Sequence, residues 1–242
     1  MSNKRSVVQY AAMKAPSRTP RLVIGNWKMR PSTLREALRL GVAVKKSAGR
    51  YTGLGVTIVP PFVYLARLRE LLRSSPVRLG AQDVFWEQEG AYTGEISAPM
   101  LASIGVSCVI VGHSERRGLG ETDEQVTRKI RAAFGSGLSP IVCVGEQARD
   151  AGGQYFATVE AQVRAACAGV PKVRARELVL AYEPVWALSE GAGHGAAATP
   201  RDVHEMVLFI RKTLADHYGR RTAEQMCILY GGSVDGTNAR TL

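Results

Sequence analysis

The feature that most constrains the fold is a repeated alternation of short apolar runs with longer amphipathic stretches. The runs are continuous rather than alternating in polarity, which is typical of strands covered on both faces. They are RLVIGNW (21–27), GVTIVPPF (55–62), VRLGAQDV (77–84), VSCVIVGHS (106–114), PIVCVGE (140–146), ELVLAYEPVW (177–186) and MCILYGGS (226–233). This alternation predicts right-handed βαβ units around a parallel sheet. A doubly wound open sheet and a closed β/α barrel both fit, and both place functional residues at the carboxyl ends of strands.

The stretches between the runs carry helical patterns of apolar residues. They cover residues 32–48, 63–75, 123–134, 155–169 and 201–218. In the first stretch Leu34, Leu38 and Val42 recur four residues apart, and Ser32 is the predicted N-cap. Thr199 and Pro200 open the last, with proline in a first-turn position.

The net charge of +11 bears on domain organisation and on partners. Residues 1–20 contain four basic and no acidic residues, which leaves +7 on the remainder. We expect residues 1–20 to be a flexible basic arm, with a transit peptide as the alternative, and residues 21–242 to be one domain. The other basic residues are scattered through helical segments, which predicts a solvated surface and no nucleic-acid partner. No apolar stretch is long enough to span a membrane, so we expect no membrane partner.

The cysteines and histidines give little indication of a metal site. Cys108, Cys143, Cys167 and Cys227 form no CxxC pair and no zinc-ligand spacing, so we expect core thiols, no metal and a reducing, cytoplasmic location. His194, His204 and His217 have no ligand-like neighbours, and we expect them to be exposed. The segment 191–196 matches GxGxxA formally, but it is separated from its strand and is interpreted as a glycine-rich loop.

Polar residues gather where the apolar runs end. The sets are Asn26 and Lys28, then His113, Ser114 and Glu115, then Glu183, and finally Gly231, Gly232 and Ser233. In a parallel barrel they converge on one rim. A carboxylate in a partly apolar pocket has a raised pKa and serves as a general base, while an imidazole polarises a carbonyl. A lysine neutralises phosphate or an enediolate, and a Gly-Gly-Ser turn offers backbone N–H groups to an anion. Together these groups suit proton abstraction beside the carbonyl of a small phosphorylated sugar, without a cofactor.

Several long sequence motifs resemble those of a known enzyme family. The segments GNWKM (25–29), AQDVFWEQEGAYTGEISAPML (81–101), VGHSERRGLGETDE (111–124), IVCVGE (141–146), AYEPVWAL (181–188) and YGGSV (230–234) resemble triosephosphate isomerase. The resemblance implies an α/β fold of the (β/α)8 barrel type. It also implies interconversion of dihydroxyacetone phosphate and glyceraldehyde 3-phosphate through an enediolate, in glycolysis and gluconeogenesis.

The resemblance also implies roles for individual residues. Glu183 is the implied base, His113 the neutral electrophile near a helix amino end, and Lys28 and Asn26 the groups that bind substrate and the enediolate oxygens. Glu115 supports Lys28 and Ser114, which is expected to cap or position rather than attack. Gly232 and Ser233 bind the phosphate, and Tyr230 steadies a closed lid. The loop 82–95, with Tyr92, Thr93 and Gly94 near its tip, is similar to the family's dimer loop, which implies a homodimer.

Two departures from the family pattern affect these expectations. The lid after Trp186 reads ALSEGAGHGAAATP and is longer by about four residues than a short-loop expectation. Ser189 or Gly191 stands in for the family's lid glycine, and Gly193 and Gly195 add hinge freedom, so a mobile lid is expected. The seventh run nearly reaches Leu242, so we expect a barrel that is C-terminally incomplete, lacking its last strand and helix, in a truncated record of a longer chain.

Two other functions remain open at this point. The altered lid fits a related isomerase that acts on a tetrose phosphate such as erythrulose phosphate. The missing strand and the charge fit a catalytically weak barrel that serves as a basic binding or structural protein. The standard GNWKM segment argues against the first, and the joint presence of Glu183, His113 and Lys28 argues against the second.

Overall fold

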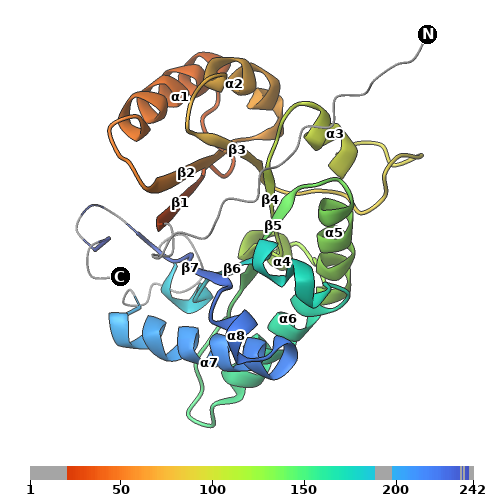
Figure 1. Cartoon of the computed structure of the whole chain (residues 1–242), viewed down its shortest axis with the longest axis vertical. Coiled ribbons are helices and arrows are strands. Elements are labelled where there is room, and N and C mark those ends of the chain that lie inside the picture. The colour runs from red at the N-terminus through yellow and green to blue at the C-terminus, as the bar shows by residue number, and fades with distance from the viewer. Residues whose placement is uncertain (1–20, 189–197, 235, 237, 240–242) are drawn as a thin grey trace.

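Seven parallel strands form one sheet that curves into a nearly closed barrel, with helices on its outside (Figure 1). The computed structural model describes residues 21–188, 198–234, 236 and 238–239. The strand order is sequential, from β1 to β7, as a β/α barrel requires and a doubly wound sheet does not. The predicted arm, residues 1–20, lies outside the described residues.

Each apolar run supplies one strand, as predicted. The strands are β1 (Arg21–Asn26), β2 (Leu54–Val59), β3 (Arg78–Ala81), β4 (Cys108–Val111), β5 (Ser139–Val144), β6 (Val179–Tyr182) and β7 (Cys227–Tyr230). Each strand ends before its run does, and the last residues of the run continue into the following loop. Asn26 is the last residue of β1, and the other polar residues named from the sequence lie just beyond the carboxyl ends of strands.

The helices also follow the predicted stretches. They are α1 (Leu34–Ala48), α2 (Leu65–Leu72), α3 (Ala98–Ser103), α4 (Ser114–Gly118), α5 (Asp123–Gly135), α6 (Gln154–Cys167), α7 (Pro200–Tyr218) and α8 (Arg220–Ala223), with 3-10 turns η1 (Phe62–Tyr64), η2 (Lys172–Glu177) and η3 (Val185–Ala187). Thr199 caps α7 and Pro200 occupies its first turn, as predicted. The predicted cap of α1 is wrong by one residue, because the hydroxyl of Thr33, not that of Ser32, accepts the N–H of Glu36.

The buried face of α1 also differs from the predicted one. Leu34 and Val42 are exposed, whereas Ala37, Gly41 and Ala48 are buried. A Cβ atom at Gly41 would lie 2.7 Å from a methyl group of Leu68 in α2. Small residues therefore let the two helices approach closely, and close approach outweighs the burial of larger side chains. Two of the three apolar residues chosen from the sequence thus face outward.

Register aligns the strand ends that carry the polar residues. Asn26 pairs with Val59 across β1 and β2, while Val144 pairs with Tyr182, which pairs with Tyr230 across β5, β6 and β7. Because the strands are parallel and in this register, the loops that follow them open on one rim. The rim is the place where the sequence predicts the site.

Two apolar layers support that rim. Inside the barrel, buried side chains of β2, β4, β5 and β6 meet in a small cluster; these are Val59, Cys108, Ile110, Ile141, Cys143 and Ala181. A larger cluster lies between the sheet and the helices and includes the fully buried Leu68, Ile130, Leu180 and Ile210. Three of the four cysteines are buried and all four are free, as expected for core thiols. No helix in the described ranges is long and apolar enough to cross a membrane.

The strands β1 and β7 are the two edges of the sheet. Within the described part of the chain each pairs with a single neighbour, β2 for β1 and β6 for β7. The described residues thus contain seven of the eight strands that a closed barrel of this type has. Val23 of β1 is half exposed at this edge.

A buried lysine joins three segments on the side of β4. Lys129 of α5 is 3% exposed, and its ammonium group contacts the carboxylates of Asp83, at 2.6 Å, and Glu121. The other oxygen of Glu121 accepts the N–H of Gly112, the residue before His113. One buried cation therefore ties the start of the loop 82–95 to the end of β4.

We expect Lys129→Met to lower the free energy of unfolding by about 3 kcal/mol, because it leaves a buried carboxylate without its cation. The neighbouring exposed pair provides the control. Arg128→Met removes a surface pair with Glu87 and should cost less than about 1 kcal/mol. Urea unfolding of both variants measures the difference, and equal effects would contradict the role given to Lys129.

Candidate active site

A cavity of about 480 Å³ opens at the rim among β1, β4, β6 and β7. Its lining includes every strand-end group that the sequence singled out as directly binding or catalytic, namely Asn26, Lys28, His113, Glu183, Gly232 and Ser233. Apolar side chains such as Ile24, Ile110 and Leu229 continue the wall into the barrel. The structure thus brings the predicted residues into one concave site.

Glu183 lies just beyond β6 and is 6% exposed. Its backbone N–H donates to Val144 at 2.8 Å, which holds the residue against the end of β5. One carboxylate oxygen accepts the N–H of Ser114 at 3.1 Å, and the other lies 3.2 Å from Nε2 of His113. The carboxylate is therefore desolvated and positioned by backbone on two sides.

His113 faces Glu183 from the end of β4. It is the N-cap of α4, and its Nδ1 accepts the backbone N–H of Glu115 at 3.2 Å. A nitrogen that accepts this bond carries no proton, so in the neutral imidazole the proton lies on Nε2, toward the cavity. The short helix α4 thus selects the tautomer that donates a hydrogen bond into the site.

Lys28 reaches the cavity from the loop after β1. Its backbone has a φ of +52°, which a non-glycine residue rarely adopts, and its N–H donates to Oδ1 of Asn26 at 2.9 Å. The side-chain amide of Gln82 donates to the carbonyl of Lys28 at 2.7 Å, and the ammonium lies 3.0 Å from Glu115. Three residues, Asn26, Gln82 and Glu115, therefore fix one strained lysine, as is common where a side chain must point into a site.

The turn after β7 completes the wall beside Glu183. The N–H of Gly231 donates to the carbonyl of Tyr182 at 2.7 Å, and a Cβ atom at Gly231 would lie 2.8 Å from Cγ of Glu183. The amide of Asn238 donates to the carbonyl of Ser233 at 3.0 Å. The glycine lets the backbone of this turn approach the carboxylate closely.

Gly145, at the end of β5, makes a second close approach. A Cβ atom there would overlap the carbonyl group of Glu183. Its own N–H and carbonyl pair with the amide of Gln162 on α6, at 2.7 and 3.2 Å. The absence of a side chain at position 145 therefore sets where the main chain of Glu183 lies.

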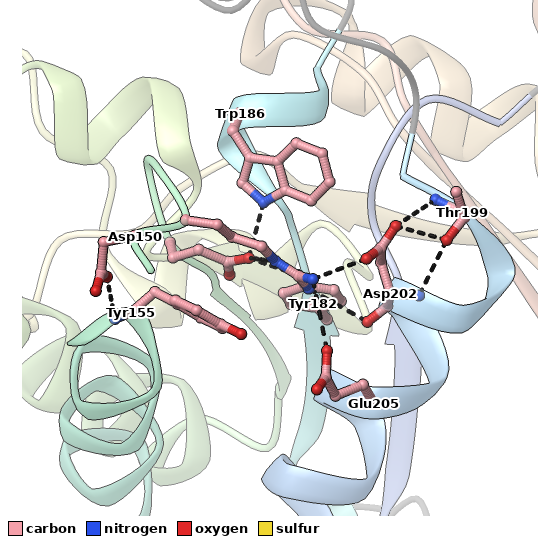
Figure 2. Close-up of polar contacts among 9 residues, drawn as sticks. Asp150, Tyr155, Tyr182, Trp186, Thr199, Asp202 and Glu205 are labelled. Carbon is pink, nitrogen blue, oxygen red and sulfur yellow. Dashed lines mark hydrogen bonds and ion pairs between the residues drawn. The ribbon is translucent and has the colours of Figure 1, made fainter. Parts of the chain in front are cut away.

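Next to the segment that carries Glu183, a buried carboxylate accepts hydrogen bonds from three side chains, of which Tyr182 and Trp186 are labelled in Figure 2. Oε1 of Glu146, whose side chain is 1% exposed, accepts the hydroxyl of Tyr182 and the indole N–H of Trp186, both at 2.8 Å, and Nε of Arg149 at 3.1 Å. Tyr182 immediately precedes Glu183, and Trp186 lies in η3 just after it. The carboxylate thus holds the segment that carries Glu183 from both sides.

Arg149 extends this network to α7. Its guanidinium donates to Asp202 at 2.8 Å and lies over the rings of Tyr155 and Trp186 (Figure 2). Burial lowers the pKa of Arg149, but the hydrogen bonds to Tyr182 and Glu146 outweigh burial and raise the pKa overall. Burial raises the pKa of Tyr182, so that phenol stays neutral.

The same network anchors the chain on both sides of the predicted lid. Trp186 bonds to Glu146 before it, and Thr199 exchanges hydrogen bonds with Asp202 after it. The hydrogen bond from the Thr199 hydroxyl, with other contacts, lowers the pKa of Asp202, which keeps the carboxylate charged toward Arg149. The lid residues Ser189, Gly191, Gly193 and Gly195, together with His194, lie outside the described residues.

Sequence reasoning missed the residues that position the site. Gln82 was placed only in a loop, and Glu146, Arg149 and Tyr182 received no role. The sequence did contain a signal for Glu146, which is the charged last residue of the apolar run 140–146. A charged residue is rarely buried without a partner, so this position could have been predicted to form hydrogen bonds or an ion pair. The ring of Tyr230 lies close to Gly232. Its role toward the lid stays a prediction, because residues 189–197 lie outside the described residues. His204 and His217 are exposed, as expected.

Two comparisons relate this chain to known proteins. A family model described as triosephosphate isomerase matches residues 21–242. A triosephosphate isomerase of Chloroflexus aurantiacus is 47% identical over 220 residues, which cover 90% of this chain and 86% of that protein. A triosephosphate isomerase of a Roseiflexus species is 46% identical over 91% of this chain and 85% of its own length, and one of a Thermoanaerobacter species is 43% identical over 91% and 88%.

We expect Gly145→Ala to lower turnover of a triose phosphate at least about 100-fold, because the new methyl group must displace the main chain of Glu183. Gly135→Ala on α5 is the matched control, since a Cβ atom there meets nothing within 4 Å. Steady-state kinetics on both variants, with circular dichroism to verify folding, gives the comparison. Full activity in a folded Gly145→Ala protein would refute the argument.

Proposed function

Because this chain belongs to the triosephosphate isomerase family, we propose that its rim site works with Glu183 as the base and His113 as the electrophile. The chain is an aldose–ketose isomerase, and its substrates are dihydroxyacetone phosphate and glyceraldehyde 3-phosphate. The observation that carries the assignment of residues is the 3.2 Å contact between Glu183 and Nε2 of His113 at the wall of the cavity.

The proposed reaction moves protons and no other group. The carboxylate of Glu183 removes a proton from C1 of dihydroxyacetone phosphate, and the C1–H electrons form the double bond of an enediolate. Nε2–H of His113 hydrogen-bonds to the C2 oxygen, where negative charge develops. Proton transfers between the two oxygens and return of a proton from Glu183 to C2 give glyceraldehyde 3-phosphate. The burial of Glu183 favours this role, because it keeps bulk water away from the base and the reacting carbon.

Cationic and backbone groups surround the position of the substrate in this proposal. Lys28, whose backbone N–H donates to Asn26 and whose ammonium pairs with Glu115, lines the same cavity as the turn 231–233. A phosphate near Ser233 would accept backbone N–H bonds, while Lys28 would neutralise charge on the phosphate and on the enediolate oxygens. The geometry therefore supports substrate-binding roles for Asn26, Lys28, Gly232 and Ser233, and a supporting role for Ser114 through its bond to Glu183.

We also propose that two copies of the chain associate through the loop 82–95. Large apolar side chains are exposed in this loop and in the segments that follow β1 and β2, with Met29 94%, Val63 79% and Tyr92 46% exposed. The loop is braced within its own chain, because the ring of Phe85 contacts the tilted rings of Trp86 and Tyr92 and Lys129 holds Asp83. A braced loop with an exposed tip is suited to insertion into a partner. A cytoplasmic location fits the four free thiols.

We expect Glu183→Gln to lower kcat about 1,000-fold, because the amide occupies the same space but does not accept a proton from carbon. Glu124→Gln, an exposed site on α5, is the matched control and should leave kcat unchanged. A coupled assay starting from each triose phosphate measures both variants. Unchanged turnover in Glu183→Gln would remove Glu183 as the base.

For the dimer, we expect Val63→Glu to shift the protein toward monomers, because two carboxylates would be buried in a symmetric interface. Val173 in η2, which is 89% exposed, is the control position, and Val173→Glu should leave assembly unchanged. Sedimentation velocity across a range of protein concentrations measures the change. Identical sedimentation of the two variants and the parent would exclude an interface at Val63.

A further inference from the structure

The positive charge of the protein is concentrated in its first two β/α units. Residues 21–82 contain 12 basic and two acidic residues, a net charge of +10, whereas residues 83–242 contain 16 basic and 19 acidic residues, a net charge of −3. Basic residues are present along the whole of residues 21–242, but in residues 21–82 few acidic residues offset them. The helices of these two units, α1 and α2, lie side by side at one end of the molecule (Figure 1).

The outer face of α1 carries a regular basic stripe. Arg35, Arg39 and Lys46 are exposed and follow the spacing i, i+4, i+11, and Arg50 extends the line just beyond the helix. On an α-helix these positions share one face, and Arg35 to Arg50 spans about 22 Å at 1.5 Å per residue. The face is outward because α1 buries Ala37, Gly41 and Ala48 instead.

The second helix carries two further exposed arginines, of which Arg69 lies beside Gly105. Arg69 and Arg73 are exposed one turn apart on α2 and at its C-cap. Lys45 donates to the carbonyl of Leu71 at 2.9 Å, which fastens α1 to α2 and fixes the two basic rows relative to each other. We call the exposed Arg35, Arg39, Lys46, Arg50, Arg69 and Arg73 the basic face.

Few acidic side chains neutralise the positive charge of the basic face. Of the two acidic residues in this region, Glu70 pairs with Arg67 and Glu36 bonds to Thr33. None of the six side chains of the basic face forms an ion pair with another described residue. Holding so many like charges on one surface costs free energy by mutual repulsion, and an extended polyanion would relieve that cost.

We propose that the basic face binds the phosphate backbone of nucleic acid without reading its sequence. A linear row of cations suits a linear polyanion, and double-stranded DNA presents one charge per about 1.7 Å of its axis. Five of the six residues are arginines, whose planar fork of donors matches phosphate oxygens in a bidentate manner. Three large apolar residues of α1 are exposed, namely Leu34, Leu40 and Val42, but only Val42 lies within the row of basic residues, which favours a charged polymer over insertion into a lipid surface. This surface lies outside the proposed isomerase site.

The test is fluorescence anisotropy of a labelled 20-base-pair DNA duplex of mixed sequence, titrated with the full chain at several salt concentrations. We expect a Kd of about 10⁻⁶ to 10⁻⁴ M near physiological salt and a slope of log K against log salt of about −4 to −5. The variant with Arg35, Arg39, Lys46 and Arg50 all changed to glutamate should bind at least tenfold more weakly, with a shallower slope. A milder variant with glutamine at these four positions should fall between the two.

The matched control changes the same amount of charge at the other end of the barrel. Lys172, Arg176, Lys212 and Arg221 are exposed on η2, α7 and α8, and their replacement by glutamate should leave most of the affinity (Figure 1). Isomerase activity and circular dichroism verify that each variant folds. Equal loss in both variants would mean that net charge alone acts, which overturns the proposal.

Two further outcomes would also overturn it. One variant tests the N-terminal segment by changing Lys4, Arg5, Lys14 and Arg18 to alanine. If this variant lost all binding to DNA while the α1 variant lost none, the binding site would lie in the N-terminal segment and not on the basic face. Binding to vesicles of phosphatidylserine and phosphatidylcholine without binding to the duplex would assign the face to a membrane instead.

Discussion

One carboxylate oxygen, Oε1 of Glu146, is the point on which the geometry of the site depends. It accepts hydrogen bonds from Tyr182, Trp186 and Arg149, and these donors come from the strand before Glu183, the turn after it and the loop that follows β5. Inside a protein such bonds are strong, and loss of any partner leaves a buried charge that is poorly compensated. The arrangement therefore fixes the chain on both sides of Glu183.

The rest of the site follows from backbone contacts made possible at that fixed point. Because Glu183 cannot shift outward, Gly145 and Gly231 must lack side chains where the neighbouring chain approaches it. The same logic applies across the cavity, where the left-handed conformation of Lys28 is held by Asn26 and Gln82. The side chains proposed for catalysis are thus positioned by main-chain atoms and by residues one layer behind them, and not mainly by one another.

Much of the fold could be predicted from the sequence because its signals are local. Continuous apolar runs gave all seven strands, and the Thr199–Pro200 pair gave the start of α7. Predictions that depended on packing between elements were weaker. The buried face of α1 consists of small residues, because Gly41 fits against Leu68. The spacing of large apolar residues in the sequence does not reveal such a face. For the site, residue type and strand end located Glu183, His113 and Lys28, but Gln82 and Arg149 act on groups 54 and 53 positions away, at Lys28 and Asp202, and no local pattern points to them.

The central claim is that Glu183, held against His113, carries a proton between two adjacent carbons of the substrate. The most direct test is turnover of dihydroxyacetone phosphate in D₂O, with deuterium at C2 of the trapped product measured by NMR or mass spectrometry. A carboxylic acid formed on Glu183 exchanges with solvent, so the account predicts product that carries solvent deuterium at C2. Product that forms at full rate with no deuterium at C2 would mean that hydrogen passes directly between the carbons, and would contradict the account.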